Sequence, residues 1–362
     1  MKTLLTKILY AVTERFKTAL FWVALPLLAL GALWCSGALF HAFDAIPIVG
    51  GVAVFALWAL LLLSLCVRRA MAAAALMETA VAAAFLCITP QQRFRDTVWQ
   101  KPWRRTLAAE KLADGRYRLK NVRDFRYRSE YEFDVRYRTA VVSPERIASI
   151  DAVFSHWDDM EEIAHSMLGL NFADGTTIVI SLETRLPEGV EQNGIDGLYK
   201  RYALAMLAGT PEDLYGLRTD HRGETLYAYR LKLDRDAMRK MTLSLLERSG
   251  ELQRRPEFYN SLARNCTTGL LPMLPDSGKL IAGDLRLLLN GMAAKMLFDL
   301  KLLVCRENES FGSLRARSLV PGRCRGKDAP AAEYGGESET RWLRDRRKSS
   351  TFYGRGSRSG GR

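Results

Sequence analysis

Two uninterrupted apolar runs near the amino terminus constrain this chain more than any other feature. They cover residues 19–40 and 48–67, and each approaches the roughly 20 residues that a helix needs to cross a bilayer. A third run, residues 70–88, is rich in alanine and contains Glu78. We therefore predict a membrane region over residues 1–90 with about three transmembrane helices, the alternative being a buried or interfacial amphipathic helix.

The distribution of basic residues orients these helices. Lysines and arginines occur in residues 2–17 and at Arg68 and Arg69, whereas the connection over residues 41–47 has neither. The positive-inside rule therefore places the amino terminus and Arg68-Arg69 in the cytoplasm. With three spans, the chain after Thr89 lies in the periplasm of a Gram-negative cell, and with two it stays in the cytoplasm. We expect a multi-pass protein of the bacterial inner membrane whose main domain is periplasmic.

After the membrane region the composition changes twice. Residues 91–320 are mixed enough to bury a sizeable core, and residues 321–362 form a basic tail rich in Arg, Gly and Ser that is typical of disorder. The net charge of +13 favours anionic partners. No folded nucleic-acid motif is present, so we expect the membrane rather than nucleic acid. Trp99 and Trp103, in the stretch WQKPWRR, are typical of a membrane–water interface, the alternative being a solvated linker with two core tryptophans.

Cysteine and histidine spacing argues against a metal site. The chain has six cysteines and four histidines, with no CxxC motif and no cluster of histidines, so no metal or dissociable cofactor is expected. Three cysteines lie in the apolar runs, and Cys266, Cys305 and Cys324 lie outside them. Whether Cys305 pairs with Cys324 stays open at this point.

The clearest local structure is a hairpin over residues 165–184. Apolar residues alternate in both strands, and Ala-Asp-Gly separates them. A three-residue loop with Gly175 in the left-handed region pairs Leu170 with Ile178 on one buried face. The same register places His165 opposite Glu183 on the other face, where the carboxylate can orient the imidazole.

Other segments predict a mixed domain. The stretches over residues 116–129, 133–142, 213–223 and 225–233 predict strands, and residues 145–150 predict a helix. Asp234 or Asp236 is expected to cap a helix over residues 236–252. The predicted fold class is α+β, with an antiparallel sheet packed on helices.

A candidate site centres on Cys266, in the stretch NSLARNCTTGLL. Asn265 or a threonine can cap a helix there, so the thiol lies in or beside its first turn, where unpaired N–H groups favour a thiolate. Thiol catalysis needs a base and an orienting group, and His165 with Glu183 is the best pair that the sequence offers. The alternative is an inert buried thiol.

The order of a strand histidine followed by a helix cysteine resembles the permuted papain-like enzymes. Several segments are similar to the Lnb N-terminal periplasmic domain family, in order from about residue 120 to 320. They include NVRDFRYRSEYEF, IAHSMLGLNFADGTTIVISLETR, RPEFYNSLARNCTTGLL and SLRARSLV. The resemblance implies a permuted papain-like domain and lipoprotein N-acyltransferase activity through a cysteine thioester, with Cys266 as nucleophile and His165 as base. Members assigned this activity carry a larger membrane region after the domain, whereas the apolar runs here precede it.

From the hairpin register we expect Glu183 to orient the base, and from the position of Cys266 at a helix start we expect Asn265 and the Cys266 N–H to hold the oxyanion. The candidate substrate-binding residues are Tyr259, Asn260, Ser166 and Arg185. The expected partners are a phospholipid acyl donor and a lipoprotein or peptide acceptor. Two alternatives stay open: a cysteine peptidase or amidase acting on cell-wall peptides, and a non-catalytic, membrane-tethered protein that binds polyanions.

Overall fold

The computed structural model describes residues 2–42, 46–67, 70–88, 94, 96–157, 160–270, 273, 284, 286 and 289–322. The chain divides into two compact units between Asp96 and Thr97. Arg68, Arg69, Cys324 and the basic tail from residue 323 lie outside the described residues. The orientation of the helices and the disorder of the tail therefore stay predictions, and the question of a Cys305–Cys324 pairing stays open.

The first unit consists of three helices that pack against one another, α1 (Lys2–Ala42), α2 (Pro47–Cys66) and α3 (Ala70–Ile88). By length and composition all three are able to cross a membrane, over Val12–Ala42, Pro47–Ser64 and Ala70–Cys87. Ala32 and Cys35 of α1 meet Leu57 and Leu61 of α2 in a small apolar core. Gly31 makes room for Glu78, since a Cβ there would lie 2.2 Å from the carboxylate.

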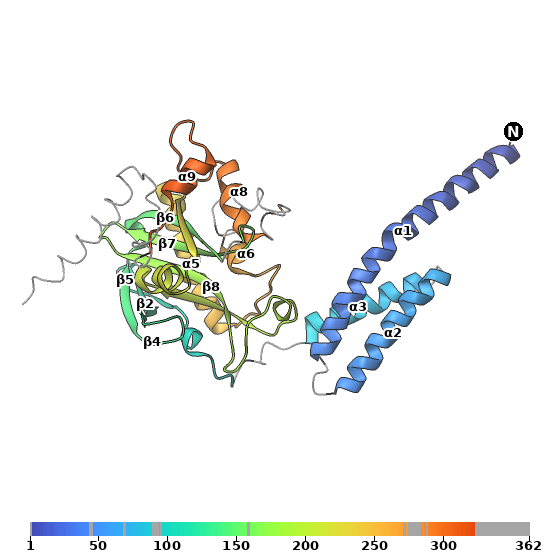
Figure 1. Ribbon diagram of the computed structural model, residues 1–362, viewed down its shortest axis with the longest axis horizontal. Helices are drawn as coiled ribbons and strands as arrows, with labels where there is room; N and C mark the ends of the chain where they lie inside the picture. The colour runs from blue at the N-terminus through green and yellow to red at the C-terminus, as the bar shows by residue number, and fades with distance from the viewer. Residues whose placement is uncertain are drawn as a thin grey trace, which may run out of the picture. The chain divides into compact units, whose positions relative to one another are not determined.

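The second unit is a mostly antiparallel sheet of eight strands covered by helices (Figure 1). The strand order is β1-β2-β9-β8-β7-β6-β10, with β5 beside β2, and β3 pairs with β4 separately. The strands are β1 (Ala108–Lys111), β2 (Tyr117–Arg123), β3 (Arg126–Tyr127), β4 (Phe133–Asp134), β5 (Tyr137–Val142), β6 (Ile147–His156), β7 (Ala164–Phe172), β8 (Thr177–Arg185), β9 (Ala203–Gly209) and β10 (Thr225–Arg230). The predicted α+β class, with an antiparallel sheet packed on helices, is confirmed.

Helices and single turns join and cover these strands. They are η2 (Lys101–Trp103), η3 (Pro144–Arg146), η4 (Asp196–Leu198), α4 (Pro211–Gly216), η5 (Leu217–His221), α5 (Arg235–Arg254), α6 (Cys266–Leu270), η8 (Asn290–Met292), α8 (Ala293–Asp299) and α9 (Phe311–Arg317). Helix α5 contacts β1, β6 and β9 and so crosses one face of the sheet. Its predicted cap is Asp234, which accepts a hydrogen bond from the Ala237 N–H at 2.8 Å.

Alternating side chains give the sheet two buried faces. Leu168, Leu170, Ile178 and Ile180 belong to the large core on the α5 side. Met167 and Val179 belong to a smaller core that also contains Leu214 of α4. The central strands are therefore buried on both faces, and polar side chains on them need internal partners.

The predicted register of the hairpin is confirmed. Leu170 pairs with Ile178 and Leu168 with Ile180. Gly175 has a φ of +85°, and the Phe172 N–H donates to the Thr176 carbonyl at 2.8 Å across the three-residue loop. A two-residue loop would have put the two apolar sets on opposite faces, so burial selects this register.

Two of the local predictions are wrong. Residues 145–150 are not helical: the chain makes one turn at η3 and then enters β6, which pairs with both β7 and β10. Residues 213–221 of the predicted strand 213–223 are helical rather than extended. The Thr210 hydroxyl caps α4 by accepting from the Asp213 N–H, and Pro211 occupies the first turn, so a strong helix start outweighs the alternating pattern.

A buried ion pair joins the start of α4 to β2. Arg123 is 2% exposed and Asp213 is fully buried. The Arg123 guanidinium donates to both carboxylate oxygens at 2.7 and 3.3 Å, and the Phe125 N–H donates to the same group at 2.7 Å. Because the Asp213 carboxylate is fully engaged, its removal leaves a buried and uncompensated guanidinium.

We expect Asp213→Ala to lower the free energy of unfolding of this unit by about 3–5 kcal/mol. Chemical denaturation of the full-length protein, followed by tryptophan fluorescence, measures the change. The control is Asp134→Ala, because Asp134 pairs with Arg128 at the surface, where both side chains are more than half exposed; that loss should stay within about 1 kcal/mol. Equal effects of the two substitutions would contradict the argument.

Candidate active site

Three separate segments of the chain meet around the Cys266 thiol. Cys266 is the first residue of α6, which packs against β7 and β8, and it is 5% exposed. The Asn265 carboxamide oxygen accepts the N–H groups of Thr267 and Thr268, each at 2.8 Å. Asn265 is thus the cap of this short helix. The helix start predicted at Cys266 is where the structure has it.

His165 lies near the beginning of β7, beside Ser181 and Glu183 of β8. Its Nε2 is 2.7 Å from the Ser181 hydroxyl and 3.4 Å from a Glu183 oxygen. The Ser181 hydroxyl donates to the same Glu183 oxygen at 2.8 Å, so it accepts from Nε2–H. The hairpin register therefore holds the Nε2 edge of the imidazole against Ser181 and Glu183, and a role for His165 as the base of the thiol stays a prediction.

The Glu183 carboxylate is held from two further sides. The Trp103 indole N–H donates to its second oxygen at 3.0 Å, and the Arg218 guanidinium of η5 lies 3.4 Å from the first. Burial acts to raise the pKa of Glu183, but the hydrogen bond and charge of His165, the charge of Arg218 and the indole N–H hold it well below its usual range. Glu183 is therefore a fixed anion behind the imidazole.

The thiol and the imidazole shift each other's pKa in opposite directions. Burial acts to raise the pKa of Cys266, but attraction to the His165 imidazolium and a hydrogen bond with it lower that pKa overall. Burial and the charge of Arg218 act to lower the pKa of His165, but Cys266 and Glu183 raise it. The arrangement favours a thiolate–imidazolium pair, which is the reactive form of a cysteine nucleophile.

An amide that we did not predict from the sequence also contacts the sulfur. The Asn290 Nδ2 of η8 donates to Cys266 Sγ at 3.6 Å. The next residue brings η8 close to the start of β7: the Gly291 N–H donates to the Glu162 carbonyl at 3.0 Å, and a Cβ on Gly291 would lie 1.9 Å from the Glu161 carbonyl oxygen. Only glycine permits this approach. In the sequence, the adjacent pair Asn290-Gly291 was the feature that could have indicated a close backbone approach here.

The remaining candidate residues differ in where the structure places them. Burial and the charge of Cys266 raise the pKa of Tyr259. The Ser166 hydroxyl lies 2.6 Å from that of Thr267, at the first turn of α6. By contrast, the Asn260 side chain accepts the N–H groups of Leu262 and Ala263 within a surface turn. Their roles in substrate binding stay predictions.

Two other predicted site residues, Asn265 and Arg185, form hydrogen bonds with backbone carbonyls of the domain. The amide of Asn265 donates to the Ser261 carbonyl at 2.9 Å, so an oxyanion role for Asn265 stays a prediction. The Arg185 guanidinium donates to the carbonyls of Trp103 and Arg104, each at 2.9 Å, and lies 4.3 Å from the Trp99 ring centroid. Arg185 thereby fixes the segment that supplies the Trp103 indole.

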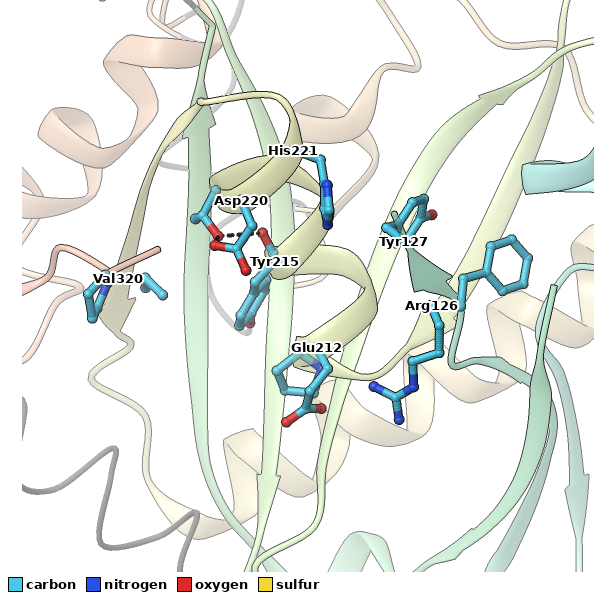
Figure 2. A pocket seen from close by; sticks show the side chains of 12 residues that line it. Arg126, Tyr127, Glu212, Tyr215, Asp220, His221 and Val320 are labelled. Carbon is cyan, nitrogen blue, oxygen red and sulfur yellow. Dashed lines mark hydrogen bonds between the residues drawn. The ribbon is translucent and has the colours of Figure 1, made fainter. Parts of the chain in front are cut away.

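A separate hollow of about 130 Å³ lies on the face that carries α4 and η5. Figure 2 shows Glu212, Tyr215, Asp220 and His221 projecting from these turns, across from Arg126 and Tyr127 of β3. Neither Cys266 nor His165 lines it. The His221 and Tyr127 rings are 5.7 Å apart, so His221 packs at the edge of this hollow rather than beside the thiol.

The lowered pKa of Cys266 predicts how fast the thiol is alkylated at different pH values. Iodoacetamide reacts with thiolates, so the alkylation rate should reach half of its plateau below the pH of about 8.5 that is ordinary for a thiol. The mass of the Cys266-containing peptide, followed over time in the full-length protein, separates this thiol from the others. A midpoint at or above that pH would contradict the thiolate–imidazolium pair.

Comparison with known proteins supports the family suggested by the sequence. Residues 133–296 match the model of a family described as the Lnb N-terminal periplasmic domain. The match contains Cys266, His165, Glu183 and Asn290 but not Trp103. No curated protein and no solved structure gives a significant match.

Proposed function

We propose that this protein is a thiol-dependent acyltransferase, because residues 133–296 match the family model of the Lnb N-terminal periplasmic domain and three helices of the chain are able to cross a membrane. It takes a fatty acyl group from a phospholipid, holds it as a thioester on Cys266 and passes it to an amine. We assign it to the bacterial inner membrane, as a multi-pass protein. The observation that carries the proposal is the buried pair of Cys266 and His165, with Glu183 behind the imidazole.

In the first half-reaction, His165 Nδ1 takes the proton of the Cys266 thiol. The thiolate attacks the carbonyl carbon of the acyl ester, so that a C–S bond forms. The C–O bond of the ester then breaks, and the lysophospholipid oxygen leaves with the proton that His165 carried. Glu183 stabilises the imidazolium meanwhile, and Ser181 holds the ring in place.

In the second half-reaction, the acceptor amine attacks the thioester carbonyl. A C–N bond forms, the amine gives a proton to His165, and the C–S bond breaks to restore the thiolate. The proposed acceptor is the α-amino group of a lipoprotein's lipidated N-terminal cysteine. The membrane helices on the same chain raise the local concentration of both lipid reactants, which favours this reaction.

Two further features support acyl transfer. The Asn290 amide beside the sulfur and the Cys266 backbone N–H are the proposed donors to the oxyanion. The helix that carries the thiol also has apolar neighbours: a Cβ on Gly269 would lie 2.5 Å from Leu182, and Leu270 belongs to the large core. An apolar surrounding suits a fatty acyl chain better than a polar peptide, and we propose that the chain enters beside these residues.

Intact-mass spectrometry of the membrane-extracted, full-length protein tests the proposal. We expect a fatty-acyl mass on the wild type that hydroxylamine removes, because hydroxylamine cleaves thioesters. Cys266→Ala should lack this mass. Cys305→Ala is the matched control because Cys305 is an exposed thiol, and it should keep the mass.

If neither the wild type nor Cys305→Ala carries an acyl mass after incubation with phospholipid, acyl transfer is the wrong assignment. Hydrolysis of a cell-wall peptide by the same preparation, lost in Cys266→Ala, would then assign the Cys–His pair to a peptidase or amidase. Acyl mass retained by Cys266→Ala would exclude this thiol as the acyl carrier.

A further inference from the structure

The segment that enters the second unit is fixed to the end of β8. The Gln100 side chain donates to the carbonyls of Pro187 and Val190 at 3.1 and 2.6 Å. Arg185 holds the carbonyls of Trp103 and Arg104, as described above. The turn η2 within this segment therefore has a fixed position on the domain, and with it the side chains on either side of Trp103.

Three cationic side chains of this segment line one hollow of about 330 Å³. They are Lys101, Arg104 and Arg105, and the remaining wall consists of Val135 and Tyr137. The Arg105 guanidinium lies 5.1 Å from the centroid of the Tyr137 ring, which steadies it by a cation–π contact. Trp103, between these cations in the sequence, is directed to Glu183 instead.

The charge of this hollow is uncompensated. Among the residues that the structure describes, no carboxylate lies within salt-bridge distance of Lys101, Arg104 or Arg105. Cations on the neighbouring strands do have such partners: Arg118 and Lys120 both reach Glu110, at 3.3 and 3.0 Å. Three like charges gathered without a counter-charge repel one another, so an anion that enters the hollow lowers the energy of the arrangement.

We propose that this hollow binds the phosphate of an anionic phospholipid headgroup. Arginine pairs are suited to phosphate because their planar forks donate two parallel hydrogen bonds, and a lysine adds a compact charge. The lipid is favoured over free phosphate because the segment that carries these cations follows α3, a helix able to cross a membrane, on the same chain. Lysine and arginine side chains held near a membrane surface are attracted to anionic headgroups. The proposal concerns binding and does not depend on the acyl transfer proposed above.

Native mass spectrometry of the full-length, delipidated protein tests the assignment. Short-chain phosphatidylglycerol is titrated as the probe, with phosphatidylcholine of the same chain length and inorganic phosphate as the other arms. The variant is Lys101→Gln/Arg104→Gln/Arg105→Gln. The control is Lys111→Gln/Arg146→Gln/Lys232→Gln, which removes the same charge from exposed positions elsewhere on this unit.

We expect the wild type to bind one more molecule of phosphatidylglycerol than the variant, with the affinity of this site at least about tenfold higher than for phosphatidylcholine. The control should match the wild type. Equal binding by variant and wild type, or no preference for phosphatidylglycerol, would overturn the proposal. Inorganic phosphate that binds as tightly as the lipid would overturn the lipid assignment. Unchanged thermal unfolding by circular dichroism shows that the variant is folded.

The result is independent of the proposed activity. If the hollow binds the lipid and no acyl thioester forms, the lipid site stands and the acyltransferase assignment fails. If the thioester forms and the variant binds lipid like the wild type, the acyltransferase assignment stands and the lipid site fails.

Discussion

Replacing Cys266 by serine is expected to lower the rate of acyl transfer by about 10⁴-fold or more. A serine hydroxyl is a much weaker acid than a thiol, so the His165 imidazole that holds a thiolate at this position will not hold an alkoxide. The substitution changes one atom in a buried site, and the hydrogen bonds of α6 and its Asn265 cap stay in place. The loss therefore reports chemistry rather than folding.

Transfer of a labelled acyl group from phospholipid to a lipopeptide amine, by the full-length protein in nanodiscs, measures this rate. The control is Cys305→Ser, which should transfer at the wild-type rate because Cys305 is exposed and outside the site. A Cys266→Ser protein that keeps a tenth of the wild-type rate would show that another group carries the acyl chain.

Replacing His165 by glutamine is expected to lower the transfer rate by about 10²–10⁴-fold. Two functions are lost together: the base that accepts the thiol proton, and the cation that lowers the pKa of Cys266 against the effect of burial. Without His165, burial remains as the largest influence on the thiol, so its pKa rises. Alkylation of Cys266 near neutral pH should therefore slow in parallel with transfer.

A second buried histidine provides the control for this prediction. His156 lies at the end of β6, is 7% exposed and packs edge-on against Tyr227. His156→Gln disturbs a buried imidazole but removes no partner of the thiol, and it should leave the alkylation profile of Cys266 unchanged. If both substitutions move the profile alike, the effect is structural and His165 is not the base.

The alternation of apolar residues along the chain was sufficient to predict the part of the site that lies on the β7–β8 hairpin. The alternation of Leu168, Leu170, Ile178 and Ile180 admits one register that buries both sets, and this register carries His165 to Glu183. The polar residues around Cys266 similarly marked a helix start, because Asn is a strong cap. In both cases the information lies within about twenty residues of the chain.

The rest of the site depends on contacts between distant segments. Trp103 reaches Glu183 across 80 positions of sequence, and its surroundings in the sequence indicated a membrane interface instead. Asn290 reaches Cys266 across 24 positions, by way of an approach at Gly291 that no periodicity reveals. The error at residues 213–223 had a local cause: the Thr210-Pro211 start of α4 was outweighed in our prediction by the alternation that follows it.

The hydrogen bond from Trp103 also limits how such a protein can be rearranged. Trp103 precedes the range that matches the family, residues 133–296, yet its indole N–H is one of the groups that fix Glu183. Genetic recombination that joins a different membrane anchor to this domain must therefore break the chain ahead of Trp99. A fusion made at residue 133 would also remove β1 and β2, leaving β9 paired with β8 on one side alone. The segment that carries Trp103 and the thiol site therefore have to be exchanged together.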